Sequence, residues 1–329
     1  MSRPTIAGVA RAAGVSVASV SRVLNGLPAT EEMVERVQRA VEELGYVPDS
    51  RARSLKVGRT FQLTLAVADV GNPVYVTMMR AVEEVVSAAG YRLVVTTTGP
   101  DVVDEVALVR GMARGYADGL VISPLRVDDD LVKSIRECEV PVVVAGNVPA
   151  KAGVDTVRAN SPKGILLAVE HLTAKGRRQI AFVNGPADTV PGTARAKGFA
   201  DAMKEFKLRS AGEIEAADFT FAAGREAGKK LFKRSRPNAV ICANDLLAVG
   251  VMHELAAYGL EVPKDVAVVG MDDSELAEQS FPPLTSVNLG SAERGRRAAE
   301  LLLARIEDST RTPRRIVVQP TLSVRRSTP

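Results

Sequence analysis

The sequence predicts an all-α N-terminal unit followed by an α/β part made of two lobes. Helical patterns, with apolar residues three and four positions apart, fill the first 48 residues. From about residue 61 onward, apolar β-branched runs alternate with helical segments, which is the pattern of parallel sheets built from βαβ units. Seven such runs are many for one layer, and 329 residues are long for one core. Two α/β lobes are therefore expected.

The first two helices are expected over TIAGVARAA (5–13) and SVASVSRVLN (16–25), with Gly14 between them. Gly14 can adopt the left-handed conformation of a tight turn, and Ser16 can cap the second helix. This arrangement is typical of a helix-turn-helix, whose second helix enters the major groove of DNA with its N-terminus first.

In the second helix three apolar residues would pack inward: Val20, Val23 and Leu24. The outward face would carry Ser16, Ala18, Ser21 and Arg22. Arg22 could make the bidentate contact to guanine that groove geometry favours. A three-helix bundle without a DNA role fits the same periodicity, so the pattern leaves both interpretations open.

A third helix is expected over TEEMVERVQRAVEELG (30–45), with Thr30 as its N-cap and Gly45 as its C-terminal stop. Residues 1–60 hold nine Lys and Arg against six Asp and Glu, a net charge of +3, whereas the rest of the chain is nearly balanced. This concentration favours a polyanionic partner for the N-terminal unit, although an uneven surface charge without function would look the same.

The strands of the α/β part are expected where β-branched residues cluster: LTLAVAD (63–69), YRLVVTTT (91–98), DGLVISP (118–124), PVVVAGN (141–147), RQIAFVNG (178–185), NAVICAND (238–245) and DVAVVGMD (265–272). Helical segments separate them, among them 74–90, 163–176, 224–235 and 246–259. Between the two parts, PDSRARSLKVGRT (48–60) is basic and poor in apolar residues, and is expected to be a linker.

Targeting signals and cysteine usage favour a cytoplasmic protein. No run approaches 18 apolar residues, and MSRPTIAGVARAAGV lacks the apolar core and cleavage site of a signal peptide. Cys138 and Cys242 are far apart in sequence, and Cys242 lies in the apolar run AVICA. A buried reduced thiol is therefore expected there rather than a disulfide.

Two long stretches, TIAGVARAAGVSVASVSRVLNG and ELGYVPDSRARSLKVGRT, closely resemble the headpiece and hinge of the lactose-repressor/galactose-repressor (LacI/GalR) family of bacterial transcription factors. The resemblance continues in order through NPVY (72–75), AVEHL (168–172), GRRQIAFVNGP (176–186), Asn244 with Asp245, VPKDVAVVGMDD (262–273), PPLTSVNLG (282–290) and RRAAELLLARI (296–306). On these matches the chain is identified as a member of this family.

The resemblance implies three parts. These are a helix-turn-helix headpiece (1–48), a hinge (49–60), and an effector-binding and dimerisation domain (61–329) of the type I periplasmic-binding-protein-like fold. Its N-lobe would comprise about 61–159 and 291–319, and its C-lobe about 160–290 and 320–329.

The resemblance also assigns DNA contacts. It implies that Val17, Ala18 and Arg22 contact bases in the major groove. Phosphate contacts are implied for Thr5, Ser16, Ser21, Asn25 and Tyr46. The periodicity of the second helix would instead allow Val17 to be buried. In the hinge, Ala52 lies where paired hinges touch and Leu55 would wedge into the minor groove, with Lys56 beside it on the DNA. Leu55 could alternatively cover the core domain.

Ligands of open α/β sheets bind beyond the carboxyl ends of the strands. That location, together with the resemblance, indicates an effector site formed by Asn72, Tyr75, Asn147, Arg195, Phe219, Asn244 and Asp272. Asp245 and Asp273 are further candidates, for which a capping or surface role is the alternative. Amides, carboxylates and a guanidinium beside aromatics suit a polyhydroxylated ligand such as a sugar. Val74 and Asn147 depart from residues frequent in the family, so no one member's ligand is transferred.

The sequence therefore predicts a regulator that represses transcription, binds double-stranded operator DNA as a homodimer and responds to a small molecule in the cleft. Alternatives are a sugar-binding protein without a DNA role and a purine-type regulator that depends on a corepressor. No leucine heptads follow LSVRRSTP, which favours a dimer over a tail-made tetramer.

An enzyme is poorly supported by the residues. His171 and His253 both lie in helical patterns, and no Walker A loop or GxGxxG follows a strand. The adjacent Asp272 and Asp273 are badly placed to flank a glycosidic bond. No cofactor, metal or membrane partner is expected.

Overall fold

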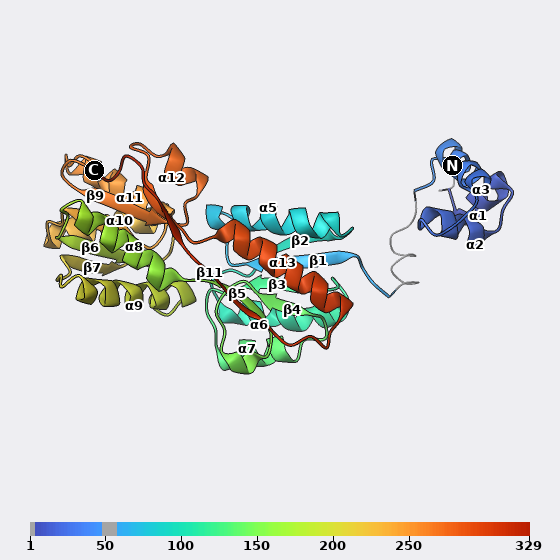
Figure 1. The fold of residues 1–329 in the computed structure, drawn as a ribbon, viewed down its shortest axis with the longest axis horizontal. Coiled ribbons are helices and arrows are strands. Elements are labelled where there is room, and N and C mark those ends of the chain that lie inside the picture. Colours follow the sequence, from blue (N-terminus) through green and yellow to red (C-terminus); the bar gives the residue numbers. More distant parts are fainter. Residues whose placement is uncertain (1–3, 48–57) are drawn as a thin grey trace. The chain divides into compact units, whose positions relative to one another are not determined.

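The computed structural model describes residues 4–47 and 58–329 (Figure 1). The chain divides into two compact units, Met1–Thr60 and Phe61–Pro329. The small unit is helical and the large unit is α/β, so the predicted fold class is confirmed. Residues 49–57 of the predicted hinge lie outside the described residues.

Three helices form the described part of the small unit: α1 (Ile6–Ala13), α2 (Val17–Leu24) and α3 (Glu31–Leu44). Each begins after a residue whose hydroxyl accepts a backbone N–H of the first turn, as N-capping requires: Thr5, Ser16 and Thr30. Each helix contributes a fully buried valine to the shared core: Val9, Val20 and Val37. The predicted helices and caps are confirmed.

The turn between α1 and α2 gives the small unit its shape. The two helices are bent by 102° relative to each other, within the range of about 90–120° seen in helix-turn-helix motifs. Gly14 provides the turn with a left-handed φ of 61°. Arg36 of α3 then donates to the carbonyl oxygens of Ala13 (Nη2, 2.6 Å) and Gly14 (Nη2, 3.0 Å), so the third helix satisfies the end of the first.

Gly8 is the weak point of α1, because glycine stabilises a helix less than any residue except proline. A Cβ there would lie 3.6 Å from the Thr5 hydroxyl, an ordinary contact. We expect Gly8→Ala to raise the free energy of unfolding of the headpiece by about 0.5–1 kcal/mol, measured by amide hydrogen exchange in α1 and α3 of the full chain.

The matched control is Gly14→Ala. Its φ of +61° is left-handed, and a Cβ would lie 2.7 Å from Arg36 Nη2, so the same substitution should destabilise the headpiece. Changes of the same sign at the two glycines would contradict this account of the turn.

The described large unit contains two six-stranded sheets, one in each lobe. The N-lobe sheet is parallel throughout, in the order β11-β5-β4-β3-β1-β2. Its strands are β1 (Gln62–Val67), β2 (Arg92–Thr97), β3 (Leu120–Ser123), β4 (Val142–Val144), β5 (Asp155–Ala159) and β11 (Arg315–Val318). Its helices are α5 (Pro73–Ala88), α6 (Val102–Gly111), α7 (Asp129–Arg136) and α13 (Ser291–Glu307), with 3-10 turns at Met112–Arg114 and Ala150–Ala152.

The C-lobe sheet has the order β12-β10-β9-β8-β6-β7, and β12 alone is antiparallel. Its strands are β6 (Ile180–Asn184), β7 (Gly212–Glu215), β8 (Ala239–Cys242), β9 (Ala267–Met271), β10 (Thr285–Asn288) and β12 (Thr321–Ser323). Its helices are α8 (Ser161–Ala174), α9 (Val190–Glu205), α10 (Phe221–Arg234), α11 (Asp245–Ala257) and α12 (Glu275–Gln279).

Paired helices cover the sheets: α5 packs beside α13 and α6 beside α7 in the N-lobe, and α8 beside α9 and α10 beside α11 in the C-lobe (Figure 1). The strand cores are almost wholly apolar, as parallel strands covered on both faces require. All seven predicted strands are confirmed, and Cys242 on β8 is a buried free thiol as predicted.

Within residues 61–329 the chain passes between the lobes three times: between β5 and α8 (159–161), between β10 and α13 (288–291), and between β11 and β12 (318–321). The third passage runs through the middle of the large unit, where β11 leads toward the C-lobe (Figure 1). Three adjacent linking segments allow the lobes to rotate about a common hinge.

Among the described residues, no single helix is both long and apolar enough to cross a membrane. The bent pair of α1 and α2 meets that test only when the two are taken together, by length and composition.

Candidate functional site

The outward face of α2 carries the side chains that the sequence assigns to DNA. Ser16, Ala18 and Arg22 are exposed, and Ser21 is half-buried. The one position left open by periodicity, Val17, is 45% exposed rather than part of the core. Val17 is the first residue of α2, and its exposed side chain offers an apolar surface to a thymine methyl group.

Four of the remaining predicted contacts lie in the described part of the headpiece: Thr5, Ser16, Asn25 and Tyr46. Thr5 and Ser16 cap α1 and α2, so their hydroxyls lie at helix N-termini, where backbone N–H groups also attract phosphate. Asn25 Nδ2 donates to the Ser21 carbonyl at 2.6 Å, and Tyr46 packs half-buried against the headpiece core. The predicted hinge contacts lie outside the described residues: Ala52, Leu55 and Lys56.

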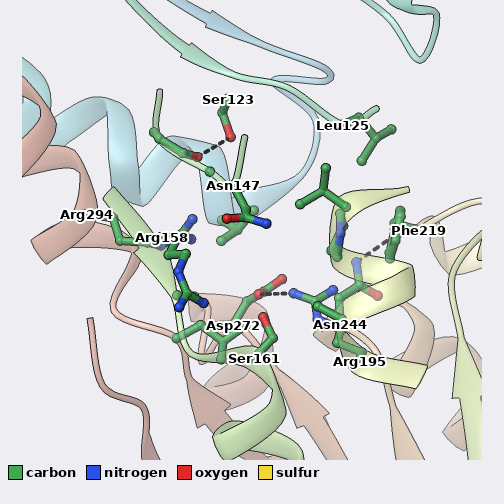
Figure 2. Close-up of a pocket in the computed structure, with 18 of the residues that line it drawn as sticks. Ser123, Leu125, Asn147, Arg158, Ser161, Arg195, Phe219, Asn244, Asp272 and Arg294 are labelled. Carbon is green, nitrogen blue, oxygen red and sulfur yellow. Dashed lines mark hydrogen bonds and ion pairs between the residues drawn. The ribbon is translucent and has the colours of Figure 1, made fainter. Parts of the chain in front are cut away.

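In the large unit, a cavity of about 270 Å³ lies between the lobes (Figure 2). All seven residues predicted for the effector site line it: Asn72, Tyr75, Asn147, Arg195, Phe219, Asn244 and Asp272. Both lobes contribute, since Tyr75 lies on α5 of the N-lobe and Arg195 on α9 of the C-lobe. A concave site with converging polar groups is the usual form of a small-molecule site.

Strand ends explain why these side chains converge. Asn72, Asn147, Asn244 and Asp272 follow β1, β4, β8 and β9, and the carboxyl ends of parallel strands share one edge of each sheet. Asp272 has a φ of 99°, a left-handed backbone that turns the chain sharply at the end of β9.

Arg195 and Asp272 form the charged centre of the C-lobe wall. Arg195 Nη2 lies 3.5 Å from Asp272 Oδ1, and both side chains are less than 10% exposed. The Arg195 guanidinium also lies over the Phe219 ring, 5.9 Å from its centroid. Burial raises the pKa of Asp272, against the nearby guanidiniums of Arg195 and Arg294 that lower it.

Two neighbours position Phe219 at the cavity: Gly185 leaves space for its ring, and Asn244 hydrogen-bonds to its backbone. A Cβ on Gly185, after β6, would overlap the Phe219 ring, so only glycine fits beside it. Asn244 is 1% exposed and donates to the Phe219 carbonyl oxygen at 2.8 Å, while its own oxygen caps α11 through the Leu247 N–H at 2.9 Å. Asn244 therefore positions the Phe219 backbone as well as lining the cavity.

The N-lobe wall presents the Tyr75 phenol and several groups that the sequence did not single out. Burial raises the pKa of Tyr75, against nearby Arg294, so the phenol is a neutral donor at pH 7. The groups missed on this wall are Ser123, Arg158 and Arg294; on the C-lobe side the sequence also missed Ser161 and Lys197. Arg158 is the next-to-last residue of β5, a strand that the sequence analysis did not predict, and Arg294 lies within α13, where the strand-end rule does not apply.

Asp245 and Asp273 do not line this cavity, and the structure gives both a structural role. Asp245 accepts the Ser274 N–H and hydroxyl at 2.8 Å and the Ser286 hydroxyl at 2.5 Å. Asp273 pairs with Arg325 at 2.8 Å and accepts from Ser323. Asp245 is buried and Asp273 is half-buried, so both hold neighbouring parts of the C-lobe together, and neither has the capping or surface role given as the alternative.

Glu105 is 1% exposed and hydrogen-bonds to the backbone of Leu125, a residue that lines the cavity. Its Oε1 accepts the Leu125 N–H at 3.1 Å, and its buried Oε2 has no hydrogen-bond partner among the described residues. Burial raises the pKa of Glu105 from 4.5 to about 7, although the Leu125 N–H and Arg126 lower it. The adjacent Arg126 joins the lobes through a bidentate pair with Asp188, at 2.8 and 3.0 Å.

We expect Glu105→Gln to stabilise the chain more at pH 8 than at pH 5. Between about pH 4.5 and 7 the folded chain holds a proton that the unfolded chain releases, so the wild-type free energy of unfolding falls as pH rises through this window. The difference between the two pH values should be on the order of 2–3 kcal/mol, measured by thermal unfolding. Glu83→Gln, at an exposed position, is the control. An equal effect of Glu105→Gln at both pH values would contradict the assignment.

Comparisons with known proteins match both units. Residues 5–49 match the model "Bacterial regulatory proteins, lacI family", and residues 169–328 match the model "Periplasmic binding protein-like domain". The chain is 36% identical to the HTH-type transcriptional regulator CelR of Thermobifida fusca, over 99% of this chain and 98% of that protein. It is 34% identical to the ribose operon repressor of Escherichia coli K12, over 98% and 99%.

Solved structures agree with these relatives. A complex of CelR with cellobiose superposes with a TM-score of 0.75 at 35% identity, covering 99% of this chain and 100% of that one. The lac repressor dimer bound to operator and the anti-inducer ONPF superposes with a TM-score of 0.89 at 26% identity, covering 99% of each chain.

Proposed function

The chain belongs to the lacI family of bacterial regulatory proteins, and we propose that it represses transcription from a near-palindromic operator under the control of a small molecule. One observation carries the proposal: a single chain joins a helix-turn-helix with an open α2 face to a two-lobed unit with a polar cavity between its lobes. The first part suits DNA, the second suits an effector, and neither alone would make a regulator.

The DNA half of the proposal rests on α2. The helix would enter the major groove with Val17 and Ala18 against base edges and methyl groups, and with Arg22 donating to a guanine. The hydroxyls of Thr5, Ser16 and Ser21, with Asn25 and Tyr46, would contact phosphates and fix the orientation of the helix. Ala52, Leu55 and Lys56 would add minor-groove and backbone contacts from the hinge.

A homodimer follows from the symmetry of a palindromic site, since each protomer would read one half-site. The lac repressor, at 26% identity, is a dimer on its operator in the structure described above. Two headpieces double the phosphate contacts, so the affinity should fall steeply with salt concentration. A protein with this role would work in the cytoplasm, where operator DNA is accessible.

The effector half rests on the cavity. Asn72, Asn147 and Asp272 supply amides and a carboxylate, and Phe219 supplies an aromatic face, which together suit a sugar or sugar derivative. The relatives CelR, seen with cellobiose, and the ribose operon repressor point to the same class. A ligand that contacts both lobes would bind one relative orientation of the lobes more tightly than another. DNA would likewise bind more tightly to a dimer in one of these orientations. The two affinities are then reciprocally coupled, typically by about 1–3 kcal/mol.

The proposal is tested by binding the purified chain to fragments of its own genome and adding a small-molecule extract of the same cells. We expect specific fragments to be retained and the extract to change their retention about 5- to 150-fold in one direction. Specific retention that no amount of extract alters would reject effector control. Retention without preference for any fragment would reject the DNA half.

A further inference from the structure

The inter-lobe cavity has an excess of positive charge. Three arginines line it, Arg158, Arg195 and Arg294, and Asp272 is the one acidic residue among the described lining residues. Lys197 also lines it, but that side chain is exposed and pairs with Asp201 at 2.5 Å. A site for a neutral sugar needs no such excess.

Within the part of the chain that the structure describes, one of the three arginines has a charged partner. Arg195 pairs with Asp272 at 3.5 Å. Among the described residues, neither Arg158 nor Arg294 makes a side-chain hydrogen bond or an ion pair within 4.0 Å, and the Arg294 Nε is buried without a partner. The Asp245 carboxylate also acts electrostatically on Arg195, but it accepts hydrogen bonds from the hydroxyls of Ser274 and Ser286.

The two arginines without a charged partner both line the N-lobe side of the cavity. Figure 2 shows Arg158 and Arg294 on one side of the cavity, Arg195 on the other, and Asp272 between them. Arg158 comes from β5 and Arg294 from α13, so two segments of the N-lobe bring their guanidiniums to the same wall. Burial lowers the pKa of Arg294, and the nearby positive charge of Arg195 lowers it further, while Asp272 raises it.

Such a pair is unfavourable for an empty protein. Arginine stays protonated in proteins, so it cannot relieve burial by losing its charge. Both side chains are half-buried, and a charge withdrawn from water without a partner costs stability. The positive charges of Arg294 and Arg195 also repel each other. A group that costs stability and forms no internal contact is typical of a ligand site.

We infer that the effector is an anion, a polyhydroxylated molecule whose phosphate or carboxylate is bound by Arg158 and Arg294 while Arg195, Asp272 and Asn147 bind its hydroxyls. The inference rests on the effector role proposed above and names the chemical class of that ligand. Guanidinium groups bind phosphate and carboxylate through paired, charge-assisted hydrogen bonds, which neutral hydroxyls cannot match.

The first test compares two substitutions on α13 in the full chain, without ligand and at low salt. Arg294→Met should raise the unfolding temperature by about 2–4 °C, since it removes a half-buried charge that has no charged partner. Arg305→Met is the matched control: Arg305 pairs with the buried Asp155 at 2.6 Å, so this variant should melt at a lower temperature than the wild type. If Arg294→Met also lowers the unfolding temperature, Arg294 stabilises the empty fold and the inference fails.

Inorganic phosphate is the second probe, because it needs no matching sugar stereochemistry. At constant ionic strength, millimolar phosphate should raise the unfolding temperature of the wild type and leave that of Arg294→Met and Arg158→Gln nearly unchanged. An equal rise in all three proteins, or none in the wild type, would overturn the inference.

Binding of glucose, glucuronate and glucose 6-phosphate is then compared. The three share one sugar ring and differ in carrying no charge, a carboxylate or a phosphate. We expect one charged derivative to bind at least tenfold more tightly than glucose, and the tighter of the two identifies carboxylate or phosphate. Glucose binding as tightly as both would contradict an anionic effector. The retention of genomic DNA is measured separately, so loss of specific DNA binding would reject the proposed function while these probes still report on the cavity.

Discussion

Arg195→Met is expected to abolish the response to the small-molecule extract and to leave specific DNA retention in place. The guanidinium is buried, pairs with Asp272 and lies over Phe219, so the variant removes the centre of the C-lobe wall. Removing one member of a buried polar pair at a binding site costs about 2–5 kcal/mol, which is roughly 30-fold or more in effector affinity. The measurement is the amount of extract that changes DNA retention by half.

A second variant separates binding from folding. Arg195→Met leaves the buried Asp272 carboxylate without its ion-pair partner and should lower the unfolding temperature of the core. The double variant Arg195→Met with Asp272→Asn removes that unpaired charge and should recover most of the lost stability, while the response to extract stays lost. A response that returns together with stability would show that Arg195 supports the fold and does not bind the effector.

Arg22→Ala is expected to relax the base preference at one position in each half-site and to weaken specific binding by about 1–3 kcal/mol per half-site. Arg22 is exposed, and the one side-chain hydrogen bond that it makes to a described residue, to the Pro28 carbonyl oxygen, is 3.5 Å long, so the headpiece should remain folded. The measurement is competition between duplexes that differ at single base pairs.

Arg11→Ala is the matched control, because it removes the same charge from an exposed site on α1. It should weaken specific and nonspecific binding alike and leave every base preference intact. If Arg22→Ala behaves in the same way, Arg22 contributes only charge, and base reading falls to other residues.

Local patterns were enough to predict the headpiece and the central strands. The helices are short and carry their own caps, such as Ser16 and Thr30, so their bounds are set by neighbouring residues. The strands missed by the sequence analysis are short and have polar ends: DTVRA of β5, GEIE of β7, TSVN of β10, RIVV of β11 and TLS of β12. Their conformation depends on distant partners, as where Arg315 of β11 lies beside Thr156 of β5.

The same distinction applies to the cavity. Asn72, Asn147, Asn244 and Asp272 follow predicted strands, so a general rule for parallel sheets was enough to bring them together. Arg294 could not be found in this way, because it lies within the helix α13 and does not follow a strand that the sequence predicted.

The central claim is that α2 of two protomers reads a symmetric operator, and selection from random duplex DNA tests it most directly. The purified full chain is incubated with the library, and the retained duplexes are sequenced after several rounds. The account predicts one enriched palindrome whose two half-sites change together in Arg22→Ala. A retained pool without enrichment, or an enriched site without two-fold symmetry, would contradict it.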